Sequence, residues 1–299
     1  MINTSINLTQ KKIRILCTDA KNEIIFLKEE ESNVDFSEDV SIYGSNFEII
    51  NELAEIISNA LKSENIPALN ARLILDVNQF FINSVPVETF DAESLKSYII
   101  WDISNFYPDI YKNFIVNYHK IISSSEAQDI LGDYRILTIS IRNNCINFIN
   151  ELFRRCNLTI EKIDIDLFAL NNLFKTNPGA DSKLIMNCYK NRIDYLIMSG
   201  NSLLCYDYVY FKDNNFDIEL ENNIKRLNSR KEFERVKNIY ISGEDYSEYV
   251  LNEIKKFYGN KEISIINPLN FLKPGENFVN KDVLNNSGYK FASVAGALI

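Results

Sequence analysis

The chain has 299 residues, and its 32 Lys and Arg against 41 Asp and Glu give a formal net charge of −9. With 46% hydrophobic and 24% charged residues, it has the composition of a folded chain of one large or two medium domains and not of a disordered one. The acidic balance argues against nucleic acid or an anionic membrane surface as a partner, because phosphate binding needs clustered Lys and Arg.

Scarce residue types exclude several kinds of site. The nine glycines include no adjacent pair and no G-x-G spacing, which excludes a P-loop and a Rossmann fingerprint. The single histidine, His119, excludes a multi-histidine zinc site and is interpreted as a surface residue of a strand. The five cysteines lack C-x-x-C spacing and are interpreted as small buried side chains in a reducing compartment. The sequence shows no signal peptide and no run of ~18 apolar residues, so it predicts no membrane span.

The first half alternates predicted strands and helices. KIRILCTD and EIIFLKEE predict a strand pair around a turn at residues 20–22. Ser45 is the expected N-cap of a helix whose apolar residues, from Phe47 to Leu61, recur at helical spacing. The next elements are a strand region at 72–87, a helix that Asp91 caps and that ends before Pro108, strands at 113–121 and 134–141, a helix with Ile149 and Leu152 on one face, and the strand LTIEKIDID.

The second half begins after a loop at residues 176–181. KLIMNCY, RIDYLIM and LLCYDYVYF predict a three-strand meander, and a polar helical stretch follows at about 216–235. The strand NIYIS ends at Gly243, and a helix at about 245–258, the strand EISII and an apolar C-terminal helix complete the chain. Meander, helix, strand and helix in each half predict two related α/β halves.

Several single features have a structural interpretation at this level. Trp101 lies next to the apolar face of its helix and is interpreted as a packing residue rather than a partner contact. Asp164 and Asp166 alternate with isoleucines and are interpreted as the solvent side of a strand. The aromatic run at 206–211 is interpreted as a packed strand, with partner binding as the alternative.

The order and spacing of three segments resemble the actin-like pilus assembly family PilM and its relatives, the cytoplasmic domain of GspL and the cell-division protein FtsA. ESLKSYIIWDISNFYP is similar to a family helix with a Trp-acid pair and an aromatic-Pro end. INFINELFRRCNLTIEKIDIDLFALNNL is similar to the family's helix–turn–strand–helix unit, and FASVAGALI to its closing helix.

The resemblance implies an α/β, actin-like (ribonuclease H-like) fold with two lobes around a nucleotide cleft. Residues 1–181 would form the first lobe, with an inserted ββαββα-type subdomain at about 72–159. Residues 182–299 would form the second lobe, with an outer subdomain reduced to about 212–236.

The resemblance also implies where the nucleotide-binding groups of the family would fall. A gapless match puts Leu16 and Thr18 at the acid and glycine positions of the first D-x-G hairpin. Asn187 and Tyr189 take the acid and glycine positions of the second hairpin. At the glycine-rich adenosine turn, Gly243 is kept and is followed by the acidic residues Glu244 and Asp245.

These residue types are unsuited to binding Mg-ATP. A leucine cannot orient a metal-bound water, and an asparagine lacks the charge of a carboxylate. A tyrosine at a phosphate-binding turn fills the space of the phosphate, and Glu244 would repel a polyanion. We therefore expect a pseudo-ATPase with no catalytic residue, no metal site, and neither ATP nor Mg as cofactor. The alternative is a shifted alignment in which Asp19 is the acid of the first hairpin.

The function implied by the resemblance is that of a non-catalytic scaffold in a type IV pilus or type II secretion-like assembly platform. The protein would be cytoplasmic and peripheral to the inner membrane, bound to the cytoplasmic N-terminal peptide of a single-span assembly protein. A groove between the first-lobe core and the inserted subdomain would hold that peptide. The alternatives are an active actin-like ATPase, a sugar-kinase-like phosphotransferase or an FtsA-like filament-forming protein, although no terminal amphipathic helix with a basic face supports the last. A homo-oligomer is left open.

Overall fold

The computed structural model describes residues 2–44, 46–67, 69–87, 91–108, 113–121, 134–175, 182–211, 216–243, 248–276, 278, 283 and 287–299.

Three antiparallel strands begin the chain and form the core of the first sheet. The sheet has the order β14-β3-β2-β1-β4-β8, in which β4 and β8 run parallel to β1. Its strands are β1 (Asn3–Thr9), β2 (Lys12–Thr18), β3 (Glu23–Glu31), β4 (Asn70–Leu75), β8 (Thr159–Ile165) and β14 (Lys273–Pro274). The predicted pairing of KIRILCTD with EIIFLKEE is confirmed as β2 with β3.

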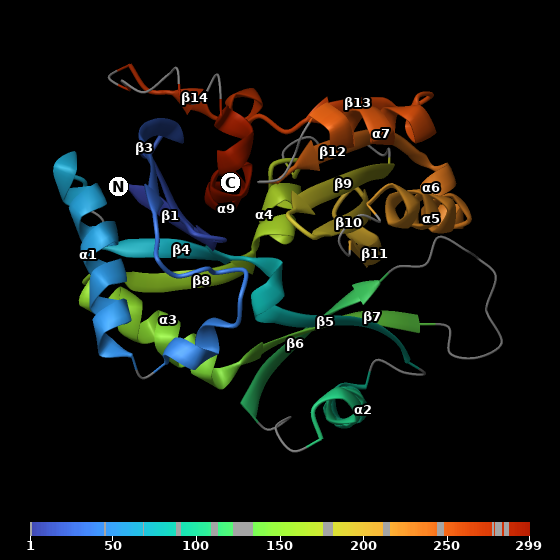
Figure 1. The fold of residues 1–299 in the computed structure, drawn as a ribbon, viewed down its shortest axis with the longest axis horizontal. Coiled ribbons are helices and arrows are strands. Elements are labelled where there is room, and N and C mark those ends of the chain that lie inside the picture. The colour runs from blue at the N-terminus through green and yellow to red at the C-terminus, as the bar shows by residue number, and fades with distance from the viewer. Residues whose placement is uncertain are drawn as a thin grey trace.

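Two amphipathic helices, α1 (Phe47–Ser63) and α3 (Asn143–Arg155), cover the outer face of this sheet (Figure 1). Their apolar side chains join those of β1 and β2 in one buried cluster. The N-cap of α1 is Asn46, whose side chain accepts a hydrogen bond from the Ile49 amide at 3.2 Å. The expectation that Ser45 caps this helix is therefore wrong by one residue, and Ser45 itself lies outside the described residues.

The second sheet repeats the plan of the first. An antiparallel meander of three strands is followed by two strands parallel to its first member, in the order β11-β10-β9-β12-β13. The prediction of two related α/β halves is therefore confirmed. The strands are β9 (Ser182–Tyr189), β10 (Arg192–Ser199), β11 (Ser202–Tyr210), β12 (Val236–Ser242) and β13 (Glu262–Ile265); the helices on the outer face are α5 (Phe216–Asn228), α6 (Lys231–Glu234) and α7 (Glu248–Tyr258).

Two short helices, α4 (Asp166–Asn172) and α9 (Ala292–Leu298), lie between the two sheets (Figure 1). They contribute to a buried cluster that also contains Leu16 of the first sheet and Ile185 of the second. A Cβ atom on Gly296 of α9 would lie 2.0 Å from the carbonyl oxygen of Ala169 in α4, so only glycine allows this approach. The two helices thus pack backbone against backbone at the centre of a five-layer molecule.

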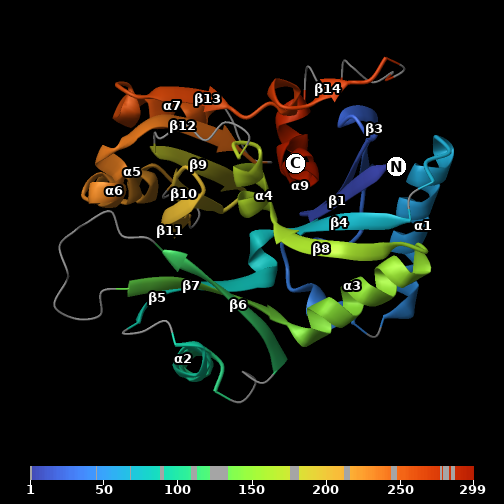
Figure 2. The ribbon, with the colours of Figure 1, turned by 180° about the vertical axis from the view of Figure 1, so that it is seen from behind.

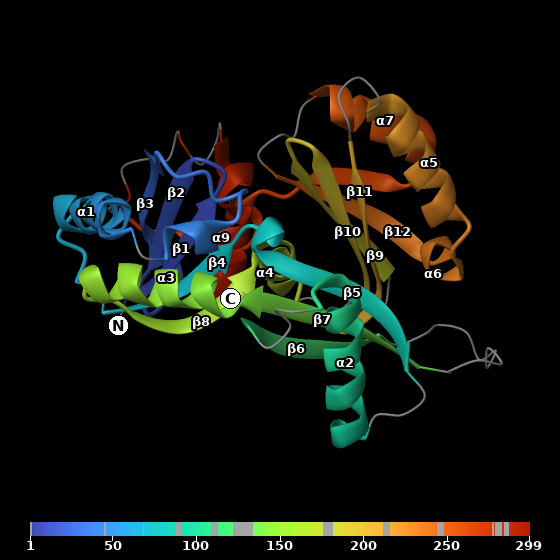
Figure 3. The same cartoon turned by 60° about the horizontal axis from the view of Figure 1, so that its bottom comes forward.

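A separate three-stranded sheet, with the order β5-β7-β6, lies beside the two lobes (Figure 3). The helix α2 (Ala92–Phe106) covers one face of it, and Asp91 caps this helix as predicted by accepting a hydrogen bond from the Ser94 amide at 3.0 Å. The unit formed by these elements spans residues 80–142, whereas β4, α3 and β8 belong to the first lobe. Its strands are β5 (Phe80–Val87), β6 (Phe114–Ile121) and β7 (Tyr134–Arg142); short 3-10 turns are η1 (Val40–Tyr43), η2 (Val77–Gln79), η4 (Pro268–Asn270) and η5 (Gly288–Phe291).

The C-terminal segment returns to the first lobe (Figure 2). β14 pairs in parallel with β3, and α9 packs against β1, β2 and β4. The guanidinium of Arg72 in β4 donates a hydrogen bond to the carbonyl oxygen of Ala297. The expected second-lobe range of 182–299 therefore includes residues that pack with the first lobe, because apolar side chains of α9 complete the inner face of its sheet.

Candidate functional site

The matching order of the two sheets identifies the hairpins that face each other across the lobes. In each meander the first strand, β1 or β9, also pairs in parallel with a later strand, β4 or β12, so the β1–β2 hairpin corresponds to the β9–β10 hairpin. Leu16 and Thr18 lie in β2 beyond that turn, fully buried and paired with Ser5 and Asn3. The first hairpin is therefore β1–β2, one strand earlier than the hairpin in which the alignment placed Leu16 and Thr18.

A polar strand explains the misplaced first hairpin. β1 buries Thr4, Ser5, Asn7 and Thr9 and has only two apolar residues, Ile6 and Leu8, so its strand signal is short and weak. The alternative acid, Asp19, lies at the opposite end of β2, in the tight turn to β3. Its carboxylate accepts hydrogen bonds from the amides of Lys21 and Glu23 at 2.8 and 2.9 Å, so Asp19 stabilises that turn.

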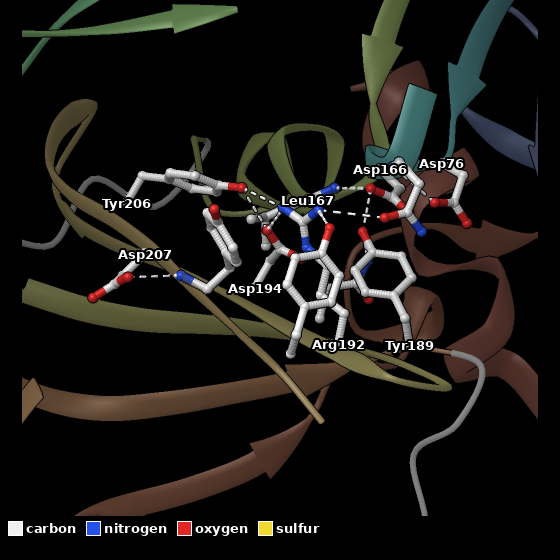
Figure 4. A network of polar contacts seen from close by, with 12 residues as sticks. Asp76, Asp166, Leu167, Tyr189, Arg192, Asp194, Tyr206 and Asp207 are labelled. Atoms are coloured by element: carbon white, nitrogen blue, oxygen red, sulfur yellow. Dashed lines mark hydrogen bonds and ion pairs between the residues drawn. The ribbon is translucent and has the colours of Figure 1, made fainter. Parts of the chain in front are cut away.

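The second hairpin sends the side chain of Tyr189 into the space between the lobes (Figure 4). The Tyr189 hydroxyl donates a hydrogen bond to Oδ1 of Asp166 at 2.6 Å and accepts one from Nδ2 of Asn187 at 2.7 Å. Asp166 begins α4 of the first lobe and is 4% exposed, which corrects its interpretation as a solvent-facing residue. Burial raises the pKa of Asp166 well above its usual value.

Gly243 ends β12 with a φ of +121°. A Cβ atom at this position would lie 2.1 Å from the carbonyl oxygen of Cys188 in β9, so glycine is required by strand packing alone. Glu244 and Asp245, which were expected to repel a nucleotide, lie outside the described residues. Gly243 and the second hairpin are therefore close together, as the resemblance implied, whereas Leu16 and Thr18 do not join them.

The cleft between the two hairpins is almost filled by side chains. Its free volume is about 20 Å³, which is enough for about one water molecule. Binding sites for drug-sized ligands usually exceed about 300 Å³. The cleft is lined by Asn7, Thr9, Arg14, Asp166, Asn187, Tyr189, Ser242, Gly243, Tyr289, Lys290 and Ser293.

A buried ion pair on β10 extends this polar network. Arg192 donates to both carboxylate oxygens of Asp194 at 2.6 and 2.7 Å, and to the Tyr206 hydroxyl at 2.8 Å. It also donates to Oδ1 of Asn78 at 3.3 Å, which links the second lobe to η2. No sequence motif marked this pair, although Arg192 and Asp194 are two residues apart and therefore lie on one face of a strand.

A third acidic side chain, Asp76, lies at the end of β4 and is fully buried. It accepts hydrogen bonds from the Thr9 hydroxyl at 3.1 Å and the Asn78 amide at 3.0 Å. Burial, with a smaller contribution from the nearby Asp194, raises the pKa of Asp76 to about 6. In the described part of the chain, no three His, Cys, Asp or Glu side chains are grouped to hold a metal ion.

Two hollows lie between the three-stranded sheet and the two lobes. The first, which we call the aromatic hollow, has a volume of about 250 Å³ and lies where the first lobe, the three-stranded sheet and β10–β11 meet. The second, the arginine hollow, has a volume of about 220 Å³ and lies between the three-stranded sheet and β11 with α6. The aromatic hollow is lined chiefly by Phe80, Phe81, Tyr107, Phe114, Arg142, Tyr208 and Tyr210, and the arginine hollow by Ile82, Ser84, Ile121, Arg135, Cys205, Asp207, Tyr208, Arg230 and Glu232.

The side chains of Trp101 and His119 are both exposed. Trp101 is 58% exposed on α2 with its ring 5.6 Å from that of Tyr98, so its interpretation as a packing residue is wrong. Leu95, Ile99 and Ile103 form the buried face of α2 in its place. His119 is exposed on β6 as predicted, and its ring stacks on Phe168 at 6.0 Å.

Similarity to known proteins is found at the level of structure. No protein-family model and no curated protein sequence matches the chain. A chain of the PilM–PilN type IV pilus biogenesis complex matches with a TM-score of 0.75 at 12% identity, over 99% of this chain and 97% of the other. The cytoplasmic domain of EpsL, an inner membrane component of the type II secretion system of Vibrio cholerae, matches with a TM-score of 0.52 at 9% identity, over 99% and 94%. A Bacteroides thetaiotaomicron protein with an actin-like ATPase fold and unknown function matches with a TM-score of 0.50 at 16% identity, over 95% of each chain.

These similarities show that the protein has the actin-like fold, as the sequence predicted. Among its solved neighbours are the PilM–PilN complex and the EpsL cytoplasmic domain, the two branches to which the sequence segments pointed. None of the helices within the described ranges is long and apolar enough to cross a membrane.

Proposed function

We propose that this protein is a non-catalytic, actin-like scaffold of a type IV pilus or type II secretion-like assembly platform. It would act in the cytoplasm, held at the inner membrane by a single-span partner. The fold similarity to the PilM–PilN complex and to EpsL supports the platform role. The observation that carries the non-catalytic role is the Tyr189 hydroxyl bound to Asp166 in a cleft of about 20 Å³.

Nucleotide binding would break several stabilising contacts at once. A triphosphate at the second hairpin would displace the Tyr189 ring and leave the buried polar groups of Asn187 and Asp166 without their partner. Each buried polar group that loses its hydrogen bond costs about 1–3 kcal/mol. The two buried acids Asp76 and Asp166 would then lie close to a polyanion, which is unfavourable whenever either is ionised.

Isothermal titration calorimetry with Mg-ATP tests this part of the proposal. We expect no binding heat and no change in the urea midpoint at millimolar Mg-ATP. A ligand present at 100 times its Kd would stabilise the folded state by about 2.7 kcal/mol, which is readily measured. Micromolar binding of Mg-ATP, or hydrolysis that is lost in a Tyr189→Trp variant, would show that the protein is an ATPase.

The aromatic hollow is the proposed docking site for the partner's cytoplasmic N-terminal peptide. It lies between the first-lobe core and the three-stranded sheet, and its aromatic walls suit apolar side chains. Arg142 contributes an ion pair with Asp39, and its guanidinium lies 5.8 Å from the ring centre of Tyr107 and 6.0 Å from that of Phe114. Such a mixture of rings and polar groups is typical of grooves that bind short extended peptides.

Fluorescence anisotropy with labelled synthetic peptides tests the docking site. The peptides are the cytoplasmic N-terminal segments of single-span membrane proteins that are encoded next to this gene. We expect one of them to bind and a Phe114→Glu variant to bind it at least tenfold more weakly, since a carboxylate would enter an apolar wall. Trp101→Ala, which removes an exposed ring outside both hollows, is the matched control. The docking proposal is wrong if none of the peptides binds or if both variants lose affinity equally.

A further inference from the structure

We propose that the peptide groove continues from the aromatic hollow into the arginine hollow, where Arg135 and Arg230 bind the carboxylate of an acidic residue of the same peptide. The inference rests on the proposed function and adds the chemistry of the partner. An apolar residue would occupy the aromatic hollow, and an Asp or Glu a few positions away would occupy the arginine hollow.

The two hollows adjoin each other, because they share two lining residues. Ile82 of β5 and Tyr208 of β11 contribute to both. Tyr208 is 39% exposed, and its ring lies over the guanidinium of Arg192 at 4.4 Å. The groove therefore runs between β5 and β11, and an extended peptide would pass over a fixed aromatic ring between its two ends.

Arg135 forms one wall of the arginine hollow. It pairs across the sheet with Ile121, and both lie on the face of the three-stranded sheet opposite α2. Among the described residues, its guanidinium donates hydrogen bonds only to neutral acceptors of Ser84, to Oγ at 3.2 and 3.3 Å and to the carbonyl oxygen at 3.0 Å. Throughout the described ranges no carboxylate forms an ion pair with Arg135.

Arg230 enters the hollow from the second lobe, where it precedes α6. It donates from Nη2 to Oδ2 of Asp207 at 3.0 Å, and Arg226 donates to Oδ1 of the same carboxylate at 2.9 Å. One carboxylate thus serves two guanidiniums. The Nε donor of Arg230 is buried and has no acceptor among the described groups. A carboxylate in the hollow would provide that acceptor.

The local charge favours an anion although the whole chain is acidic. Arg135 and Arg230 balance Asp207 and Glu232 in the lining of the hollow. Arg226, which is not a lining residue, adds a third positive charge through its ion pair with Asp207. The floor of the hollow is formed by apolar groups of Ile121, Leu204 and Cys205, which lower the local dielectric and strengthen a charged hydrogen bond. Planar guanidiniums also bind carboxylates through two parallel hydrogen bonds, which a neutral amide cannot match.

Selection from a random peptide library displayed on phage tests the inference, with the full chain as bait at 0.15 M salt. Long-range repulsion by the net charge of −9 is then screened, because the Debye length is about 8 Å. We expect selected peptides to share an apolar residue and an acidic residue at a constant spacing. Synthetic versions with Glu→Gln at that position should bind roughly tenfold more weakly, as loss of a charged hydrogen bond predicts.

The double variant Arg135→Glu with Arg230→Glu should select Lys or Arg at the same spacing and keep the apolar residue. Its fold is checked by circular dichroism, and the milder Arg135→Gln with Arg230→Gln variant replaces it if it does not fold. Peptides whose binding depends on Phe114 but that show no acidic preference contradict this inference and leave the proposed function intact. Absence of any peptide that depends on Phe114 contradicts both.

Discussion

At the β9–β10 turn, the hydroxyl of Tyr189 has a donor and an acceptor on opposite sides. Asn187 donates to it from the same strand, and it donates to Asp166 of the other lobe. The tyrosine ring therefore fills the cleft and also fixes the distance between the lobes. Removal of the hydroxyl alone separates the polar contribution from the packing contribution.

We predict that Tyr189→Phe lowers the free energy of unfolding by about 1–3 kcal/mol. The ring still fills the cleft, but Asn187 and Asp166 lose a buried hydrogen-bond partner. Urea denaturation at neutral pH measures the change. Tyr208→Phe removes a hydroxyl from a ring that is 39% exposed, and we expect it to change stability by less than about 0.5 kcal/mol. Equal losses in the free energy of unfolding would show that the buried hydrogen bonds of Tyr189 stabilise the fold no more than the exposed hydroxyl of Tyr208 does.

The candidate site was only partly predictable at this scale. The positions of Asn187 and Tyr189 followed from the resemblance, because runs of buried apolar residues mark the strands around their turn. The first hairpin was misplaced, because β1 buries polar side chains whose partners are distant in sequence, such as Thr9 with Asp76. No local pattern distinguishes a buried threonine with a distant partner from one that faces water.

At the scale of elements, α2 shows that a tryptophan next to an apolar helix face need not be buried. Leu95, Ile99 and Ile103 recur at the spacing of one helix face and are at most 4% exposed. Trp101 lies off this face and contacts Tyr98. The helix therefore contributes to stability through its aliphatic side chains.

We predict a clear contrast between two alanine substitutions in α2. Leu95→Ala should lower the free energy of unfolding by about 2–5 kcal/mol, because it leaves a cavity beneath the helix. Trp101→Ala should lower it by less than about 1 kcal/mol, because the indole is 58% exposed. Denaturant melts followed by circular dichroism measure both values. A loss at Trp101 as large as that at Leu95 would contradict the exposed position of the indole.

Most elements were predictable where the local signal was strong. The meander of the second half follows from its runs of apolar residues, and the cap of α2 follows from an aspartate before a helix. The extent of the three-stranded unit was not predictable, because β4 and β8 look like its strands in sequence but pair with β1 and with each other. Pairing between distant strands is a tertiary property that local propensity does not determine.

At the scale of the whole molecule, the interface between the lobes gathers three buried acids from separate segments. Asp76 follows β4, Asp166 begins α4 and Asp194 lies in β10. Arg192 compensates Asp194 directly, whereas Asp76 and Asp166 lie among neutral donors. The lobes are therefore joined by groups whose protonation affects folding.

The native chain should lose stability as the pH rises, because Asp76 must ionise while it is buried. We predict that Asp76→Asn, which cannot ionise, does not show this loss. Burial raises the pKa of Asp76 to about 6 in the folded state, against about 3.9 when unfolded. The folded state therefore holds a proton that the unfolded state has lost between these values. The associated stability is fully present below about pH 4 and is lost as the pH rises through about 6.

The stability of Asp76→Asn relative to the native chain should therefore increase by up to about 3 kcal/mol from pH 4 to pH 7. Urea denaturation across this range measures it. Asp91→Asn is the control with the opposite sign, because hydrogen bonding to Ser94 lowers the pKa of Asp91. A difference for Asp76→Asn that does not vary with pH would mean that the pKa of this carboxyl is the same in the folded and unfolded states.

Because the C-terminal segment packs on the first lobe, dividing the gene between the two lobes would separate elements that belong to one sheet and its cover. A fragment that stops at residue 181 lacks both β14, which extends the first sheet, and α9, which covers its inner face. A fragment that starts at residue 182 carries the apolar helix α9 without the first-lobe strands and the helix α4 that cover it. We expect each fragment to aggregate when expressed alone, and the two to form a soluble heterodimer when expressed together. The lobes are therefore geometrically distinct but not autonomous folding units.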